Sequence, residues 1–413
     1  MKNRNFLLLW LGQIVSQFGD RLNQMALIAL VSARAPGSTF QLAKVLSFTI
    51  LPIFFVGPIA ASYVDRWDRR RTMMFCDLLR CALVALIACY FIHSRALAPI
   101  YIIIFLIFSA GRFFVPAKLA IIPQLVSEEK LLMANSLSVT TGMIAAVAGF
   151  GLGGLLVEEA GPAQGFLIDA ATYFISALLI FLISAKAIKS VRANRQGSPD
   201  APRLFKKSLL FDIKEGWQHL GQDSQMRFLA RLVFLLGSAL GAVSVVIVVF
   251  VQTSLGSVTK DLGVLAMCLG LGLFVGSLIY GRFGQKTSRI KMIFISLVAA
   301  GIALSLFTVC LELFASSLFA CCLALVLGLT VAPIIISVQT MVHELTQDRM
   351  RGRIFGSLDI VAYLAFFLFM FLSAFLAEKI SRFWILLTVG IVLTASGTAA
   401  ILLRLDKKRA INA

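Results

Sequence analysis

Polar and charged side chains interrupt the first apolar stretch of the chain, in the segment QFGDRLNQ. Asp20 is followed directly by Arg21, and Asn23 lies about one helical turn further on. An ionisable group inside an apolar membrane segment is expensive, so such groups usually face a polar cavity. A carboxylate there can take up and release a proton, because burial penalises its charged form. We predict that Asp20, Arg21 and Asn23 line a proton-coupling or substrate cavity; the alternative is a purely structural pair of Asp20 and Arg21.

Three further ionisable residues lie within apolar stretches. Arg112 could balance the charge of Asp20 or contact an anionic substrate, and the alternative is an arginine that extends to the membrane surface. Asp359 is a candidate gate or proton site for the same reason as Asp20. Asp169 stands near the start of another apolar stretch, where it could simply cap a helix.

The segment GPIAASYVDRWDRRR joins two apolar stretches through small residues, an acid and four arginines. An acid such as Asp65 can rest against the positive N-terminal end of a facing helix, and the arginines can pair with acids such as Asp77. These contacts would close one side of the protein. The predicted gate residues are Gly57, Asp65, Arg66, Arg69, Arg70, Arg71 and Asp77.

Glycines are dense in the segment AAVAGFGLGGLLVEEAGP. Small residues allow two helix backbones to approach closely and to slide or bend. We predict helix packing, with a possible role in gating, for Gly149, Gly151, Gly153 and Gly154.

The composition excludes a soluble protein. Of the 413 residues, 59% are hydrophobic and 14% are charged, and the mean hydropathy is +0.93, whereas soluble proteins are about 25% charged. The net charge of +18 sits in short patches between apolar runs, which favours loops at a membrane over nucleic-acid binding. The three histidines are scattered and the seven cysteines lack metal-ligand spacing, so the sequence predicts neither an enzyme, nor a metal, nor a cofactor.

Twelve apolar runs reach the length of about 20 residues that spans a bilayer. They cover approximately 6–33, 42–64, 72–93, 97–122, 132–157, 164–185, 226–254, 261–281, 290–311, 315–341, 353–377 and 382–404. We therefore predict an all-α polytopic membrane protein with twelve transmembrane helices. Lysine and arginine concentrate on the side that holds both termini and the arginine-rich turn, which predicts that this side is cytoplasmic.

The only long polar segment, 186–225, divides the chain into two sets of six runs, 1–185 and 226–413. Residues 204–220 have an amphipathic pattern that indicates a linker helix on the membrane surface or a site for a regulatory partner. The segments VPAKLAIIPQLVSEEKLLMANSL and APIIISVQTMVHELTQDRMRGRIFGSL form a weak internal repeat. Such repeats are typical of transporters that bind substrate between two bundles.

These motifs resemble the major facilitator superfamily. GPIAASYVDRWDRRR resembles its cytoplasmic signature between the second and third helices, and GFGLGGLLVEEAGP resembles the fifth-helix signature of its antiporters. More narrowly, FGD, DLLR, PAKLAIIPQLV, FLIDAATYFISALL and RGRIFGSL together resemble the exporter branch that includes macrolide and enterobactin efflux proteins. There are two departures: the basic turn has Asp68 in place of its usual glycine, and the second-half copy lacks its acid. FGD and PAK also resemble lysophospholipid transporters.

The resemblance implies two six-helix bundles and transport by alternating access. It implies a monomer in the cytoplasmic (inner) membrane with both termini inside, with a small molecule and protons as its partners and no nucleic acid. The expected function is proton-coupled efflux of small amphipathic compounds, drugs or a siderophore, with Asp20 as the coupling acid. The alternatives are a lysophospholipid flippase and a receptor that does not transport.

Overall fold

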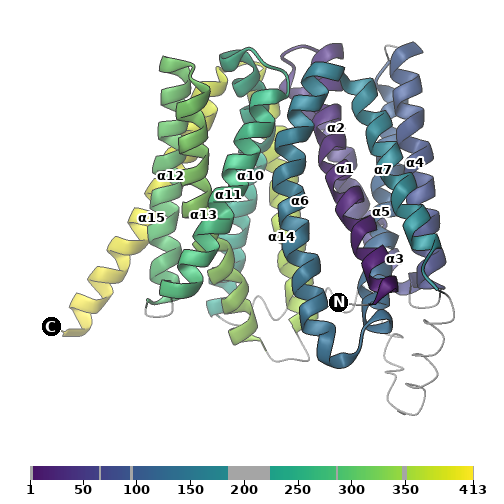
Figure 1. Cartoon of the computed structure of the whole chain (residues 1–413). Helices are drawn as coiled ribbons and strands as arrows, with labels where there is room; N and C mark the ends of the chain where they lie inside the picture. The colour runs from purple at the N-terminus through teal and green to yellow at the C-terminus, as the bar shows by residue number, and fades with distance from the viewer. Residues whose placement is uncertain are drawn as a thin grey trace. The chain divides into compact units, whose positions relative to one another are not determined.

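The computed structural model describes residues 3–64, 67–93, 96–184, 224–284, 287–346 and 351–412. Within these ranges every regular element is a helix, as the sequence predicts (Figure 1). The first half contains α1 (Arg4–Arg34), α2 (Thr39–Phe55), α3 (Gly57–Val64), α4 (Arg69–His93), α5 (Ala98–Leu125), the 3-10 turn η1 (Glu128–Lys130), α6 (Leu131–Ala160) and α7 (Pro162–Phe181). The second half contains α10 (Ser224–Leu255), α11 (Lys260–Phe283), α12 (Arg289–Phe314), α13 (Ser317–Leu345), α14 (Arg351–Ala377) and α15 (Arg382–Asn412). The predicted amphipathic helix 204–220 lies outside the described residues.

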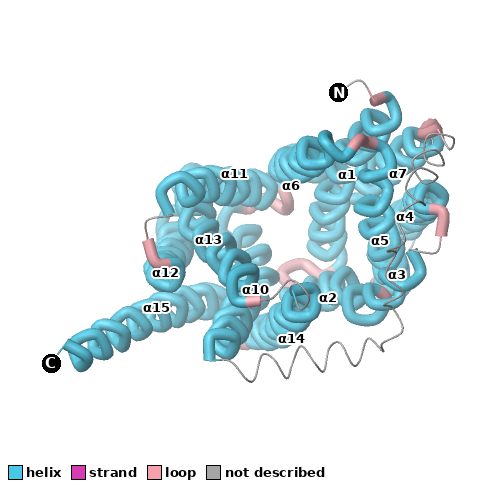
Figure 2. The backbone as a smooth tube through the Cα atoms, turned by 90° about the horizontal axis from the view of Figure 1, so that it is seen from below, coloured by secondary structure: helices cyan, strands magenta, loops and turns pink. Residues whose placement is uncertain are grey.

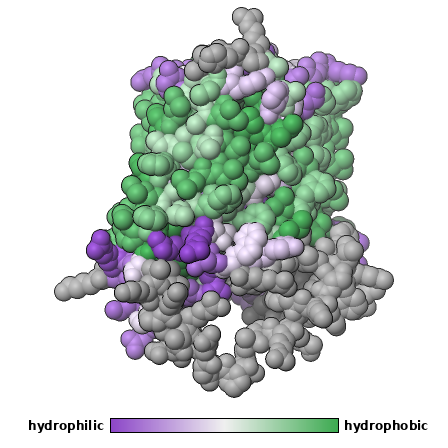
Figure 3. Space-filling view, turned by 90° about the vertical axis from the view of Figure 1, so that its right-hand side faces the viewer, coloured by the Kyte–Doolittle hydropathy of each residue, from purple (hydrophilic) through white to green (hydrophobic). Residues whose placement is uncertain are grey.

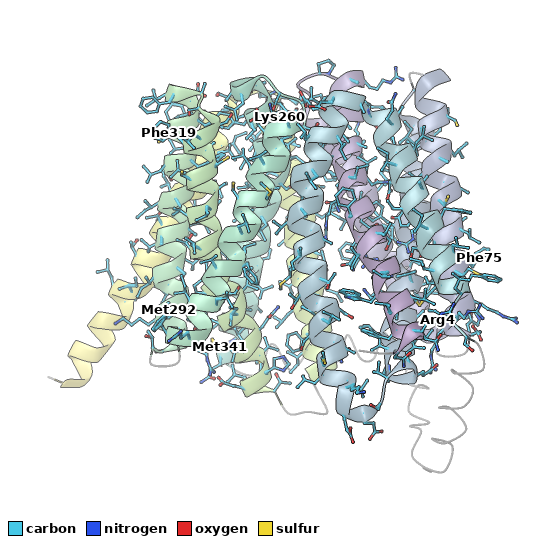
Figure 4. The ribbon with its side chains drawn as sticks, viewed as in Figure 1. Arg4, Phe75, Lys260, Met292, Phe319 and Met341 are labelled. Atoms are coloured by element: carbon cyan, nitrogen blue, oxygen red, sulfur yellow. The ribbon has the colours of Figure 1, made fainter. Side chains whose placement is uncertain are left out.

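The helices have the length and composition of membrane spans. Among the described residues, 10 helices are long and apolar enough to cross a bilayer. The 31-residue helix α1 is long enough but too polar for that criterion, because of its central cluster of charged and amide side chains. The face in Figure 3 shows a broad hydrophobic band with hydrophilic residues above and below it. Large apolar side chains such as Phe75 and Phe319 are exposed and point away from the helices that carry them (Figure 4), as lipid-facing residues do.

The second predicted run is not one continuous helix. Val56 separates α2 from α3, although its N–H still donates to the carbonyl of Pro52 at 2.9 Å. Proline has no backbone N–H, so Pro58, directly after Gly57, cannot continue the hydrogen-bond ladder. The predicted span 42–64 therefore consists of two consecutive helices, α2 and α3.

The chain forms two compact units. Unit 1 comprises Met1–Pro36, Lys44–Lys206 and Val258–Gly263, and unit 2 comprises Gly37–Ala43, Lys207–Ser257 and Val264–Ala413. The predicted bundles, 1–185 and 226–413, remain a prediction, and the units differ from them mainly in the two short segments at the starts of α2 and α11.

The same helix pairs recur in both units. In unit 1, α1 packs on α6 and α7, and α4 packs on α5 and α7; Figure 2 shows α1 beside α6 and α7. In unit 2, α10 packs on α14 and α15, and α12 packs on α13 and α15. Counted from its own first helix, each unit thus repeats the same pairing, which agrees with the weak repeat in the sequence.

Close approach of α1 to α7 depends on glycine. A Cβ atom at Gly19 would overlap the side chains of Thr172 and Asp169, and one at Gly12 would lie 3.4 Å from Ser176 Oγ. The polar side chains of α7 therefore lie directly against the backbone of α1. This contact brings the polar segment of α1 to the acids of its neighbours.

We predict that Gly19→Ala destabilises the protein by about 1–3 kcal/mol, the usual effect of forcing a methyl group into a packed contact. The matched control is Gly111→Ala, because a Cβ atom at Gly111 meets nothing within 4 Å. Thermal unfolding in detergent measures both. Equal melting temperatures for the two variants would contradict the close packing of α1 on α7.

Candidate functional site

A network of charged and polar side chains crosses the interior of unit 1, and α1, α4 and α7 supply it. Its centre is Arg80, whose side chain donates a hydrogen bond to Asp77 one turn earlier on α4. Arg80 is 6% exposed and Asp77 is fully buried. Ser176 of α7 donates a second hydrogen bond to Asp77 at 2.7 Å. A buried charge pair is stable only when its remaining polar atoms also find partners.

Two aromatic rings enclose the Arg80 guanidinium. Its central carbon lies 4.5 Å from the ring centroids of both Phe114, on α5, and Tyr173, on α7. A cation over an aromatic face is attracted to the ring by about 2 kcal/mol or more when water is excluded. The planar guanidinium is suited to this position, which an ammonium group would fill less well.

A second buried acid joins α7 to α1. Asp169 is fully buried and accepts hydrogen bonds from Asn23 at 2.6 Å and from Thr172 at 3.2 Å. Asp169 lies well inside α7, so its interpretation as a helix cap is wrong. The predicted cavity residue Asn23 is itself 4% exposed and holds this acid.

Asp20 differs from the other two acids because it is accessible. It accepts a hydrogen bond from the hydroxyl of Tyr173, and its carboxylate lies 4.0 Å from Nη1 of Arg80. Its side chain is 38% exposed. Tyr173 therefore contacts both Asp20 and Arg80, and it couples the accessible acid to the buried pair.

Asp20 opens onto a cavity of about 330 Å³ within unit 1. The cavity lies between α1 and α5, with contributions from α4 and α7. Its charged lining residues are Asp20, Arg21, Arg80, Arg112 and Lys118, and its other polar lining residues are Gln13, Ser16, Gln17, Asn23, Gln24 and Tyr173. Apolar residues of α5 line the remaining wall.

The structure brings four of the five predicted cavity residues together: Asp20, Arg21, Asn23 and Arg112 all line this space. Arg21 points its guanidinium toward Gln24, at 3.4 Å, and over the ring of Phe150, so its contacts differ from the predicted pair with Asp20. The fifth, Asp359, is an exposed residue of α14 in unit 2, and its role stays a prediction.

Sequence reasoning missed Arg80 as the partner of Asp20. The signal was present in DLLR, where an acid and an arginine stand three residues apart in the middle of an apolar run, the spacing at which helical side chains meet. The sequence analysis also assigned Asp77 to the cytoplasmic gate. The structure instead buries Asp77 against Arg80 and Ser176, because its position on α4 faces α7 inside the unit.

Part of the predicted gate is described. Arg70 donates hydrogen bonds to the carbonyls of Ile180, at 3.1 Å, and Phe181, where it satisfies the C-terminal end of α7. The carboxylate of Asp68 accepts from the backbone N–H of Arg71 at 2.8 Å at the start of α4. Asp65 and Arg66 lie outside the described residues, so their part in the gate stays a prediction. The same holds for the gating roles of Gly57 and Arg69.

The glycines of α6 pack against two partners. A Cβ atom at Gly149 would lie 2.9 Å from Cβ of Arg21, and one at Gly153 would lie 3.1 Å from Cα of Leu22, so both face α1. Gly154 instead faces the start of α11, where a Cβ atom would lie 2.9 Å from Cα of Gly263. Gly151 is buried as well. These contacts agree with the predicted packing role.

An acid at the end of α6 caps the start of α11. Glu158 accepts hydrogen bonds from the backbone N–H groups of Val258, at 3.1 Å, Thr259, at 2.5 Å, and Lys260, at 3.2 Å. Lys260 lies at the end of the helices opposite to Arg4 (Figure 4). These N–H groups have no partner within a helix, and a carboxylate is favoured there by the helix dipole.

Unit 2 repeats this arrangement. Glu378, just after α14, accepts hydrogen bonds from Ser38 Oγ at 3.0 Å and from the N–H of Phe40 at 3.2 Å, at the start of α2. A glycine with positive φ precedes each capped start, Gly37 at 72° and Gly256 at 74°. The segments GST and GSVT are therefore a second repeat, which sequence reasoning also missed.

We predict that Arg80→Met destabilises the protein by about 3–5 kcal/mol, because it leaves Asp77 charged and buried without its partner. A second change, Asp77→Asn, removes that charge and recovers part of the loss. Thermal unfolding of the two single variants and the double variant measures the coupling. Additive effects of the two changes would contradict a shared pair.

We predict that Glu158→Ala weakens the start of α11 by about 0.5–2 kcal/mol, the usual loss when a helix cap is removed. Hydrogen exchange at the amides of Val258, Thr259 and Lys260 then speeds up, while the rest of α11 changes less. The control is Glu159→Ala, which removes the same charge from an exposed neighbour. Equal exchange in both variants would show that the cap does not hold this segment.

Comparison with known proteins agrees with the sequence-based expectation. The family model described as transmembrane secretion effector matches residues 1–413. Macrolide efflux protein A of Streptococcus pyogenes is 25% identical over 391 residues, which cover 94% of this chain and 93% of that protein. A putative bacilysin exporter of Bacillus subtilis, BacE, is 26% identical over 351 residues, which cover 84% of this chain and 82% of that protein.

Solved structures share the fold. The nucleoside transporter NupG superposes with a TM-score of 0.74 at 13% identity, with 97% of both chains covered. A bacterial homologue of the iron transporter ferroportin, in its inward-facing state, gives a TM-score of 0.71 at 13% identity and covers 97% of this chain and 99% of that one. The family and these relatives are transporters, not enzymes. This multi-pass membrane protein therefore belongs to the transmembrane secretion effector family of major facilitator transporters.

Proposed function

We propose that the protein exports small amphipathic compounds, drugs or a siderophore, from the cytoplasm by alternating access, and that protons drive the export. It acts as a monomeric antiporter in the cytoplasmic (inner) membrane with both termini inside, in accordance with its lysine and arginine distribution. The basic hairpin from Gly57 to Arg71 then belongs to the cytoplasmic gate. The efflux relatives support the direction of transport.

One observation carries the proton-coupling proposal: of the three acids in the network, only Asp20 reaches the cavity. Asp77 and Asp169 are fully buried and already accept hydrogen bonds from neighbouring side chains, whereas the Asp20 side chain is 38% exposed and lines the cavity. A coupling acid must be reachable by both the proton and the substrate. Asp20 meets that requirement.

The surroundings of Asp20 give it two stable states. When it is charged, the hydroxyl of Tyr173 donates to it and the guanidinium of Arg80 lies 4.0 Å away. When it is protonated, Arg80 keeps its pair with Asp77, so no buried cation is left unmatched. A proton that arrives from outside can therefore displace a substrate bound at Asp20 without breaking the network, which is what exchange requires.

The second candidate is a lysophospholipid transporter. Lys118 of the PAK segment lines the same cavity as Asp20, which favours a substrate with a charged headgroup. This candidate differs from the first in two ways: its cargo is a lipid, and transport does not require a proton gradient. A receptor that does not transport would bind cargo without exchanging it.

We predict that Asp20→Asn abolishes gradient-driven transport but retains exchange of substrate for substrate, because an amide cannot release a proton. The measurement uses proteoliposomes with an imposed pH gradient and a panel of dyes, a macrolide, a catecholate siderophore and a labelled lysophospholipid. The control is Glu129→Gln, which neutralises an exposed acid of η1.

The outcomes separate the candidates. Gradient-driven movement of a drug or the siderophore that survives in Asp20→Asn would remove Asp20 as the coupling acid. Movement of the lysophospholipid without any gradient would favour the flippase. Binding of cargo without any exchange would favour the receptor.

A further inference from the structure

We propose that the cavity binds a zwitterion, with an anionic oxygen group of the substrate at Lys118 and Gln13 and a cationic group at Asp20. The proposal rests on the proposed function, because it names the substrate class of the same site. It divides the cavity into a cationic end and an acidic end.

The charged residues of the cavity favour a bound anion in addition to the cationic group that Asp20 would bind. Four of its lining residues are basic and one is acidic. The charge of Arg80 is matched by Asp77 behind the cavity wall. Lys118 is half-buried, no hydrogen bond or ion pair of its ammonium group is found among the described residues, and the carboxylate of Asp20 attracts it electrostatically. A partly buried charge is normally matched by a partner, so a substrate anion would complete this one.

Gln13 supplies an independent observation. Its side chain lines the cavity and is 7% exposed, and its Nε2 donor makes no hydrogen bond within the part of the chain that the structure describes. A buried donor without a partner is destabilising, because it has lost its hydrogen bonds to water. A carboxylate or phosphate oxygen would accept from this amide. Gln13, Gln17 and Lys118 also line a small adjoining space together, so they form one end of the site.

Helix geometry sets the separation of the two ends. Gln13, Gln17 and Asp20 follow one another at spacings of four and three residues, so they share one face of α1. The rise of 1.5 Å per residue places Asp20 roughly 5 Å beyond Gln17 and about 10 Å beyond Gln13. The ammonium and carboxylate of a dipeptide are separated by about 7 Å in an extended chain. A zwitterion of that size spans the site.

Besides Arg112 and Lys118, α5 contributes an apolar part of the wall, which favours an amphipathic substrate. Ile107, Phe108, Phe114 and Val115 line the cavity beside its charged groups. A substrate with an aromatic or aliphatic body can bury that body here while its charges contact α1 and Lys118. A purely cationic lipophile would leave Lys118 and Gln13 unmatched, and a purely anionic one would meet repulsion from Asp20.

The test is equilibrium binding to the purified full-length protein, measured by titration calorimetry with three matched probes. Alanyl-tryptophan is the zwitterion, its methyl ester is the cation, and its N-acetyl form is the anion. Loss of a charged hydrogen bond weakens binding by about 1.5–3 kcal/mol, roughly ten- to a hundredfold. We expect Lys118→Gln to weaken alanyl-tryptophan and the N-acetyl form by that factor and to leave the methyl ester unchanged.

Asp20→Asn gives the complementary pattern: it weakens alanyl-tryptophan and the methyl ester, while the N-acetyl form binds as well or better. Lys118→Arg retains the positive charge and keeps most of the affinity for the zwitterion. Lys130→Gln, at an exposed lysine of η1, is the control for a general change in charge. A labelled lysophosphatidylglycerol, titrated in parallel, reports whether phosphate replaces carboxylate at Lys118.

Three outcomes would overturn the proposal: binding of the methyl ester alone, an equal loss for all three probes in Lys118→Gln, or no binding of any probe at millimolar concentration. Transport separates this result from the proposed function. Gradient-driven export of the methyl ester without binding of the zwitterion would keep the exporter and remove the zwitterion site. The expected binding pattern without gradient-driven transport would keep the site and remove the proton coupling.

Discussion

The polar interior of unit 1 depends on the position of Arg80. A guanidinium in an apolar bundle is stable only because Asp77 pairs with it and the rings of Phe114 and Tyr173 lie against it. This one side chain contacts residues of three other helices, so it fixes their polar faces toward a common point. The carboxylate of Asp20 then lies 4.0 Å from a positive charge that is already paired with Asp77. The pair of Arg80 and Asp77 is thus a fixed part of the interior, and Asp20 is the acid of the network that reaches the cavity.

The same capping contact occurs at the starts of α2 and α11: in each unit a glutamate carboxylate accepts hydrogen bonds from the first residues of a helix. Glu158 and Glu378 stand at the C-terminal ends of corresponding helices, and each accepts hydrogen bonds at the beginning of another helix, after a glycine with positive φ. A carboxylate at a helix N-terminus is a contact that water can replace, so it can form and break without exposing apolar surface. Such contacts are suited to segments that a transport cycle releases and restores.

The sequence predicted the helices well, because about 20 consecutive apolar residues mark each span. It also placed Asp20, Arg21, Asn23 and Arg112 at a cavity, because charged and amide side chains are rare in such spans. It failed where the deciding factor was helix rotation. Asp77 and Arg80 stand near the arginine hairpin in sequence, yet their position on α4 turns them toward α7. The division of the second span into α2 and α3 depended on Pro58, which has no backbone N–H to donate. The repeated helix caps, GST and GSVT, were missed because they are short and lie in the turns between the apolar runs.

Burial explains why three acids in one network can have different roles. Asp77 and Asp169 each accept hydrogen bonds from helices other than their own, and neither reaches the cavity, so a change in their protonation would disturb the contacts of α7 with α4 and α1. Asp20 reaches the cavity and accepts one hydrogen bond, from Tyr173, so a change at Asp20 would disturb fewer contacts between helices. In the proposed site, Asp20 at one end of the cavity and Lys118 at the other are the two groups that contact cargo. A substrate that contacts both would be selected by two charges of opposite sign, and a proton could compete at only one of them.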